Sequence, residues 1–146
     1  MNWTEYFRNI ANQVKLKSKD NTTKIGCVIV NIDNSIISTG YNSFPRGIND
    51  NVPERQERPE KYYFMEHAER NAIYNASRNG VSTIGCTMYL SCGIPCTDCA
   101  RGIINAGIVK VVCEKELGVN GSQWTEHAKR SMIMFNESGV NIEFYD

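Results

Sequence analysis

The sequence predicts an α/β protein with three layers, in which a mixed five-stranded sheet lies between helices. Two observations lead to this prediction: an apolar hairpin pattern near the amino end, and an alternation of helix and strand patterns from residue 66 onward. Strands joined through helices favour parallel pairing with right-handed crossovers, whereas a tight turn favours antiparallel pairing. We therefore expect the 146 residues to form a single domain, residues 1–146, whose sheet is antiparallel at one edge.

The first half of the chain predicts one helix and one hairpin. Residues 2–17 have an apolar face at helical spacing, which we expect in the core. Its members are Trp3, Phe7, Ile10 and Val14. The β-branched runs 25–30 and 35–41 flank the short segment NIDN, which is typical of an antiparallel hairpin. Residues 43–64 combine prolines with many charges and have no periodicity, so they predict a long functional or mobile loop.

The second half predicts three helices and three strands in alternation. We expect helices at about 66–79, 98–107 and 122–138, and strands at 85–91, 108–113 and 140–146. Thr97 or Asp98 is expected to cap the second of these helices, and Gly107 to end it. The last helix should bury Trp124, Met132 and Phe135. Sites in such folds lie at the carboxyl ends of strands, beside the first residues of helices.

Composition narrows the class of protein. Hydrophobic residues make up 41% and charged residues 22%, as in ordinary globular proteins, and the formal net charge is zero. A balanced charge argues against a protein that coats nucleic acid. No apolar run approaches the roughly 20 residues that cross a membrane. Six cysteines without a secretory pattern indicate a reducing compartment, so we expect a cytoplasmic protein.

A histidine, a glutamate and two cysteines predict a metal site. His67 and Glu69 lie near the start of one expected helix, and Cys96 and Cys99 form a C-x-x-C pair at the start of the next. Two thiolates and one imidazole favour zinc, and three protein ligands leave a position for water, as in catalytic sites. The spacing H-x-E followed by P-C-x-x-C is the signature of zinc deaminases that act on nucleobases.

Longer stretches resemble the deoxycytidylate deaminase family. The segments SKDNTTKIGCVIVN, STGYNSFPRG, HAERNAI and PCTDCARGIINAGI occur in the family's order and at suitable spacing. They span about residues 17–113, so the resemblance implies a cytidine-deaminase-like fold over most of the chain. The zinc motif is typical of the whole superfamily, whereas the SKD turn and the G-Y-N segment are typical of deoxycytidylate deaminases.

The resemblance implies a zinc-dependent hydrolase that converts dCMP to dUMP and releases ammonia, supplying dUMP for thymidylate synthesis. His67, Cys96 and Cys99 would hold one catalytic zinc ion per chain. Glu69 would not bind the ion but would carry protons between water and the cytosine ring. The family also implies a homo-oligomer, often a hexamer, and a small nucleotide as its partner rather than a polynucleotide or a membrane.

The resemblance also suggests how the substrate is held. Asn42 would reach the sugar or the base edge, and the backbone N–H of Ala68 would meet the pyrimidine carbonyl. Lys19 and Arg46 offer cations for the 5′-phosphate, although each is equally well explained as a surface cation. The aromatic run 62–64 suits either stacking on the base or anchoring of its own loop.

Two features depart from the family pattern. The segment LSCGI before Pro95 is one residue longer than the usual spacing, which would place a bulge in the pocket wall. Residues 43–64 contain no cysteine or histidine, so we expect one zinc ion and not the second, structural one of some relatives. We therefore do not carry over regulation by deoxynucleoside triphosphates.

Other functions stay open at this point. The same chemistry on dCTP, a 5-modified deoxycytidylate, a nucleoside, a free base or a tRNA adenosine would use the same motif. The pair C-T-D-C lacks the insertion expected of a riboflavin-pathway deaminase. A zinc-stabilised module without catalysis would need a fourth ligand and gives no role to Glu69. We expect Arg70 to be a solvated helix residue, with an interface as the alternative, and His127 to be an exposed helix residue. The remaining cysteines are expected to be small core residues.

Overall fold

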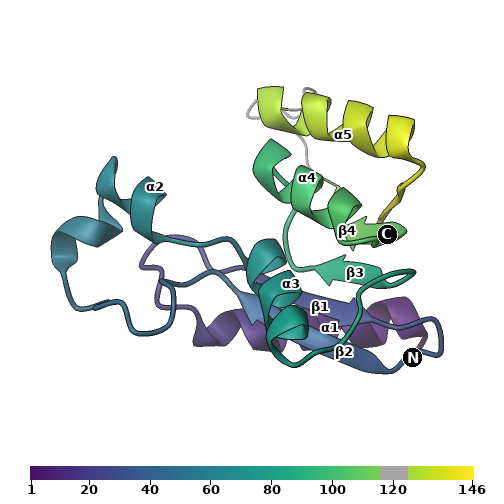
Figure 1. Ribbon diagram of the computed structural model, residues 1–146, viewed down its shortest axis with the longest axis horizontal. Coiled ribbons are helices and arrows are strands. Elements are labelled where there is room, and N and C mark those ends of the chain that lie inside the picture. The colour runs from purple at the N-terminus through teal and green to yellow at the C-terminus, as the bar shows by residue number, and fades with distance from the viewer. Residues whose placement is uncertain (116–124) are drawn as a thin grey trace.

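The computed structural model describes residues 1–115 and 125–146, and it confirms the three-layer α/β arrangement (Figure 1). Its five-stranded sheet has the order β2-β1-β3-β4-β5. The strands are β1 (Gly26–Val30), β2 (Ile36–Tyr41), β3 (Thr87–Leu90), β4 (Lys110–Cys113) and β5 (Asn141–Phe144). β1 pairs antiparallel with β2 and β3, whereas β3–β4 and β4–β5 are parallel pairs. The hairpin and the parallel portion therefore lie in one mixed sheet, as the sequence predicts.

Helices cover both faces of this sheet. They are α1 (Trp3–Val14), α2 (Glu60–Phe64), α3 (Ala68–Arg78), α4 (Thr97–Asn105) and α5 (Glu126–Ser138), with 3₁₀ turns at Lys15–Lys17 and Pro53–Gln56. Alternate residues of β1 point to opposite layers, because successive strand side chains alternate. Val28 and Val30 cluster with Phe7 of α1, whereas Cys27 and Ile29 cluster with residues of α3, α4 and α5. The core therefore has two halves separated by the sheet.

α3 lies against the edge strand β2 at very short range. Gly40 has no side chain there, and a Cβ atom built on it would lie 2.6 Å from the backbone oxygen of Ala68. Asn71 and Asn75, one helical turn apart, donate side-chain hydrogen bonds to the backbone oxygens of Tyr41 and Thr39, each at 2.8 Å. These bonds satisfy carbonyl groups on the edge strand and fix α3 along it.

The segment 43–64 corrects one expectation, because it is not a structureless loop. It contains the 3₁₀ turn at Pro53–Gln56 and the short helix α2, and Figure 1 shows it extending away from the sheet. Pro53 stands at the start of its turn, where a residue without an N–H group costs no hydrogen bond. The turn is too short to produce a periodic apolar pattern, which is why periodicity alone missed it.

Three smaller expectations also change. Trp3, the first residue of α1, is 56% exposed rather than buried, and its ring stacks on that of Phe7. α4 begins after Cys96, whose side chain makes no capping bond, and neither Thr97 nor Asp98 occupies the cap position. The register between β1 and β3 has no shift, so the longer LSCGI segment is accommodated after Leu90 rather than by a bulge. Trp124 lies outside the described residues.

Within residues 1–115 and 125–146, none of the helices combines the length and the apolar character needed to cross a membrane.

Candidate active site

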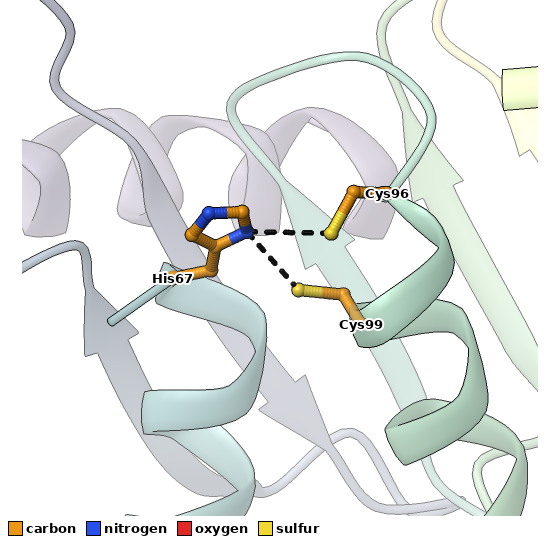
Figure 2. Close-up of side chains that lie close together, drawn as sticks. All are labelled: His67, Cys96 and Cys99. Atoms are coloured by element: carbon orange, nitrogen blue, oxygen red, sulfur yellow. Dashed lines mark hydrogen bonds between the residues drawn. The ribbon is translucent and has the colours of Figure 1, made fainter. Parts of the chain in front are cut away.

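Three side chains from two helix starts meet at one point (Figure 2). The Nδ1 atom of His67 lies 3.4 Å from the sulfur of Cys96 and 3.4 Å from the sulfur of Cys99. All three ligand atoms lie within 4.8 Å of one another. The residues are 29 and 32 positions apart in the chain, so only folding brings them together.

The fold explains this convergence. His67 is the residue before α3 and Cys96 is the residue before α4, so both stand at helix starts on the same side of the sheet. Cys99 lies one turn into α4, which places the two sulfurs on the same helical face. A backbone pair between Ser43 and Glu66 holds the chain just ahead of His67, with N–O distances of 3.1 and 2.8 Å.

The arrangement suits a zinc ion. In tetrahedral coordination with Zn–S of about 2.3 Å and Zn–N of about 2.0 Å, a sulfur and a nitrogen ligand lie about 3.5 Å apart. The two observed nitrogen–sulfur distances of 3.4 Å match this spacing. Within the part of the chain that the structure describes, no fourth His, Cys, Asp or Glu joins the group. Three ligands with one open position are typical of catalytic rather than structural zinc.

The two thiols differ in how readily they ionise. The hydrogen bond from Cys99, outweighing the effect of burial and aided by His67, lowers the pKa of the Cys96 thiol to about 3. The same bond to Cys96 and burial raise the pKa of the Cys99 thiol. Conversely, the Cys96 sulfur raises the pKa of His67. The site therefore stabilises a thiolate, which is the form of cysteine that binds metal.

Glu69 is buried beside these ligands, with 3% of its surface exposed. Burial raises the pKa of its carboxyl group above the ordinary value, despite opposing effects of its own backbone N–H and of His67. Its Oε1 atom has no hydrogen-bond partner among the described residues. A buried, unpartnered carboxylate oxygen is costly, so a group of this kind is normally retained for chemistry or for a bound ligand.

A hollow of about 300 Å³ opens over this group. His67, Glu69 and Cys96 form one side. The lining is completed by Asp20, Thr23, Ile25, Asn42, Cys92, Gly93 and Ile94. No Lys or Arg contributes to the lining among the described residues, so the hollow itself is neutral to acidic.

Asn42 lines this hollow, but its amide group already has partners. Its Oδ1 atom accepts from the backbone N–H of Ile25 at 2.9 Å, and its Nδ2 atom donates to Thr23 O at 2.8 Å and to Asp20 at 3.2 Å. Asp20 in turn forms an ion pair with Lys61 of α2 at 2.8 Å. Asn42 therefore shapes the wall of the hollow by fixing the turn at residues 18–25.

Asp20 and Lys61 were missed by sequence reasoning. Burial would raise the pKa of Asp20, but the hydrogen bonds from Lys61, Thr22 and Thr23 outweigh it and lower this pKa. Asp20 is the last residue of the SKD segment, so the motif did contain a signal for it. Nothing in the sequence pairs Lys61 with a residue 41 positions away.

Lys19 and Arg46 line a separate hollow of about 570 Å³, which shares no lining residue with the first. Lys19 forms an ion pair with Asp50 at 2.8 Å, and Arg46 donates to the side chain of Asn75 at 2.8 Å. Ala68 is fully buried as the first residue of α3. The structure thus places Asn42 and Ala68 close to the ligands but places the two cations elsewhere.

The aromatic run 62–64 lies on the extended segment. Tyr62 and Tyr63 are mostly exposed, and the Phe64 ring lies under the guanidinium of Arg55 at 4.3 Å. None of the three residues lines the hollow over Glu69. Phe64 therefore fits the second interpretation, in which the aromatic run anchors its own loop.

Arg70 is half-buried rather than solvated, whereas His127 is an exposed residue of α5, as the sequence predicts, and both make specific contacts. Arg70 donates to Glu66 at 2.7 Å and lies 3.7 Å from Asp98, so it links the start of α3 to α4. His127 of α5 lies 3.0 Å from the hydroxyl of Thr97, next to Cys96. Cys27, Cys86 and Cys113 are buried as expected, whereas Cys92 lines the hollow.

Comparison with known proteins places this site in a family. The family model described as the zinc-binding region of cytidine and deoxycytidylate deaminases matches residues 1–115. The chain belongs to this family. Among curated members, deoxycytidylate deaminase of Homo sapiens is 35% identical over 97% of this chain and 79% of the relative. Deoxycytidylate deaminase of Mus musculus is 38% identical over the same shares, and an uncharacterised deaminase of Aliivibrio fischeri is 37% identical over 96% and 91%.

Solved structures agree with the family fold. The dCMP deaminase of cyanophage S-TIM5 in complex with dCMP and dUMP superimposes with a TM-score of 0.77 at 24% identity. The alignment covers 97% of this chain and 95% of the phage chain. The apo form of the same phage protein gives a TM-score of 0.75. These matches confirm the cytidine-deaminase-like α/β fold that the sequence motifs imply.

Proposed function

We propose that this protein is a zinc-dependent deaminase that hydrolyses dCMP to dUMP and ammonia, and so supplies dUMP for thymidylate synthesis. The observation that carries this proposal is the meeting of His67, Cys96 and Cys99 beside the buried carboxylate of Glu69, whose Oε1 atom has no hydrogen-bond partner among the described residues. The names of the curated relatives, deoxycytidylate deaminases at 35% and 38% identity, support dCMP as the substrate.

His67, Cys96 and Cys99 would hold one zinc ion per chain. When bound with an open coordination position, zinc supplies hydrolytic power by lowering the pKa of water from about 15.7 toward 7. The distances of 3.4 Å from the His67 Nδ1 atom to each sulfur support this assignment, because they match the spacing of ligands around one zinc ion. The three-ligand group also argues against a purely structural zinc module, which would require a fourth protein ligand.

Glu69 would move protons during the reaction. Its raised pKa brings the carboxyl group closer to neutral pH, where a group both accepts and donates protons efficiently. Glu69 would take a proton from the attacking water, pass it to ring N3, and protonate the departing amino group. The water oxygen bonds to C4 of cytosine, the bond from C4 to the amino nitrogen breaks, and ammonia leaves.

The substrate contacts follow from position. Asn42 and Ala68 flank the hollow or its ligands and remain the proposed contacts to the sugar or base and to the pyrimidine carbonyl. Lys19 and Arg46 stay predictions for the 5′-phosphate, and a phosphate would have to displace Asp50 and Asn75 from them. We further infer that residues 1–146 act as one catalytic domain in the cytoplasm, within a homo-oligomer for which a hexamer is the specific expectation.

A substrate panel tests the proposed function. Purified protein would be assayed for ammonia release with dCMP, dCTP, 5-methyl-dCMP, 5-hydroxymethyl-dCMP, deoxycytidine and tRNA, and its zinc content would be measured in parallel. We expect about one zinc ion per chain and the highest kcat/KM for dCMP. Ammonia release from another substrate but not from dCMP would support the deamination reaction and contradict dCMP as the substrate. Zinc without ammonia release from any substrate would instead indicate a zinc-stabilised module.

A further inference from the structure

The last helix, α5, holds the turn that carries the two cysteines. Figure 1 shows α5 lying alongside α4. Two of its residues, one helical turn apart, reach the chain on either side of Cys96. Ser131 donates a hydrogen bond to the backbone oxygen of Pro95 at 2.7 Å, and Ser131 is completely buried. His127 meets the other side, at Thr97.

The contact with His127 replaces a missing cap. The first N–H groups of an α-helix have no partner within the helix, and the side chain of Cys96 makes no capping bond to α4. The backbone N–H of Thr97 donates to Nδ1 of His127 at 3.3 Å, and the Thr97 hydroxyl lies 3.0 Å from the same nitrogen. His127 therefore serves as a cap supplied by another helix.

Together these bonds fix the backbone that determines where the Cys96 sulfur points. Pro95 is held at its carbonyl and Thr97 at its amide, so the residue between them is held at both of its peptide neighbours. Cys96 itself is only partly buried, and packing alone constrains it less than it constrains Cys99, which is fully buried. A ligand on a loosely held turn has to be ordered when the metal binds, which weakens binding.

We propose that Ser131 and His127 are positioning residues that preorganise Cys96 for the metal. The inference rests on the proposed zinc site, and neither residue belongs to the group of three ligands or lines the hollow over it. Removal of a contact that orients a metal ligand without binding the metal typically changes metal affinity about 10- to 100-fold. The sequence shows neither residue in a deaminase motif, because both lie on a helix beyond the stretch that the family model matches.

The test measures how tightly the zinc-loaded, full-length protein holds its metal. Zinc transfer to an excess of a chromogenic chelator would be timed for wild type, Ser131→Ala and His127→Phe. We expect each variant to release zinc about 10- to 100-fold faster than wild type. His127→Asn, which keeps an acceptor near the position of Nδ1, should recover most of the difference.

Two control variants separate positioning from general stability. Ser138→Ala lies on the same helix, but its hydroxyl bonds to Phe135 O within α5, so zinc release should stay at the wild-type rate. Phe135→Leu should lower the melting temperature by opening the core, since Phe135 is fully buried, without a matching acceleration of zinc release. If Ser131→Ala does not fold, the comparison of His127→Phe with His127→Asn decides the outcome, because His127 is exposed.

A second readout separates this inference from the proposed function. In cobalt-substituted protein, the thiolate-to-metal absorption reports directly on the two sulfur ligands. We expect a shifted or weakened band in Ser131→Ala and an unchanged band in Ser138→Ala. Zinc release at the wild-type rate in both Ser131→Ala and His127→Phe would overturn the inference. A wild-type protein that binds zinc but releases no ammonia would contradict the proposed function alone.

Discussion

Glu69 shows how one residue acquires a chemical role from its surroundings. The same carboxylate on a solvated helix would titrate near its ordinary pKa of 4.5, but burial at the start of α3 raises that pKa. Its unpartnered Oε1 atom is directed to no hydrogen-bond donor among the described residues, although it stands beside the three predicted ligands. The energetic cost of this arrangement suits a proton carrier and would serve no purpose in a purely structural residue.

Replacing Glu69 with glutamine tests this role at the residue scale. Glu69→Gln keeps the shape of the side chain and all three ligands, so the variant should retain its zinc. It removes the group that exchanges protons, and kcat for dCMP should fall about 10²- to 10⁴-fold. The exposed Glu137→Gln serves as the control and should behave as wild type. Retention of a tenth of the wild-type kcat by Glu69→Gln would remove the proton-carrier assignment.

At the scale of elements, the position of α3 on β2 sets the position of the site. α3 begins directly after His67 and contains Glu69, so any displacement of this helix moves a ligand and the proton carrier together. Gly40 allows the close approach, and the side chains of Asn71 and Asn75 fix the helix along the strand. The helix and the edge strand therefore act as one structural unit beneath the site.

A pair of glycine-to-alanine variants tests this contact. In Gly40→Ala the new Cβ atom would lie 2.4 Å from the backbone nitrogen of Ala72, so the helix must shift. We expect a loss of about 1–3 kcal/mol in the free energy of unfolding, as in overpacked cores, together with a reduced zinc content. Denaturant unfolding monitored by circular dichroism measures the change.

Gly102→Ala provides the matched control for this comparison. Gly102 lies inside α4, and the nearest atom to its added Cβ would be the Cγ of Arg70, at 3.8 Å. Because alanine favours the helix, this variant should gain about 0.5–1 kcal/mol and keep its zinc. Equal effects of the two substitutions would show that the close packing at Gly40 is not required.

At the scale of the whole molecule, the site joins parts of the chain that are distant in sequence. His67 precedes α3, Cys96 precedes α4, and α5 supports the cysteine turn from the carboxyl half. An ion held by these residues binds the folded chain in preference to the unfolded one, which has no converged ligands. Preferential binding stabilises the folded state by about 2.7 kcal/mol when the free ion is at 100 times its dissociation constant.

Removal of the metal should therefore lower the melting temperature of the wild-type protein. We expect a decrease on dialysis against a strong chelator and recovery when zinc is restored, followed by scanning calorimetry. Cys96→Ser lacks one ligand, so its melting temperature should be low and insensitive to the chelator. A wild-type protein that melts at the same temperature with and without the chelator would contradict a zinc ion bound at this site.

The sequence predicted the elements well wherever a local pattern was strong. The hairpin, the alternation of helices and strands, and the ligand set followed from β-branched runs, helix spacing and the H-x-E and C-x-x-C motifs. Local reasoning failed at the segment 43–64, where the turns are too short to show a period, and at Trp3, where burial depends on what lies opposite. Both failures have the same cause, because a periodic pattern carries information only about the residues within it.

The sequence by itself determined the mixed sheet and the residues with metal-binding chemistry, because both depend on residue types at short, regular spacing. Only the tertiary structure decided which groups surround that chemistry. It placed Asp20 and Asn42 at the hollow, Lys19 and Arg46 in another, and His127 and Ser131 against the cysteine turn. Such contacts join side chains tens of positions apart, and their formation depends on how whole layers pack rather than on any local pattern.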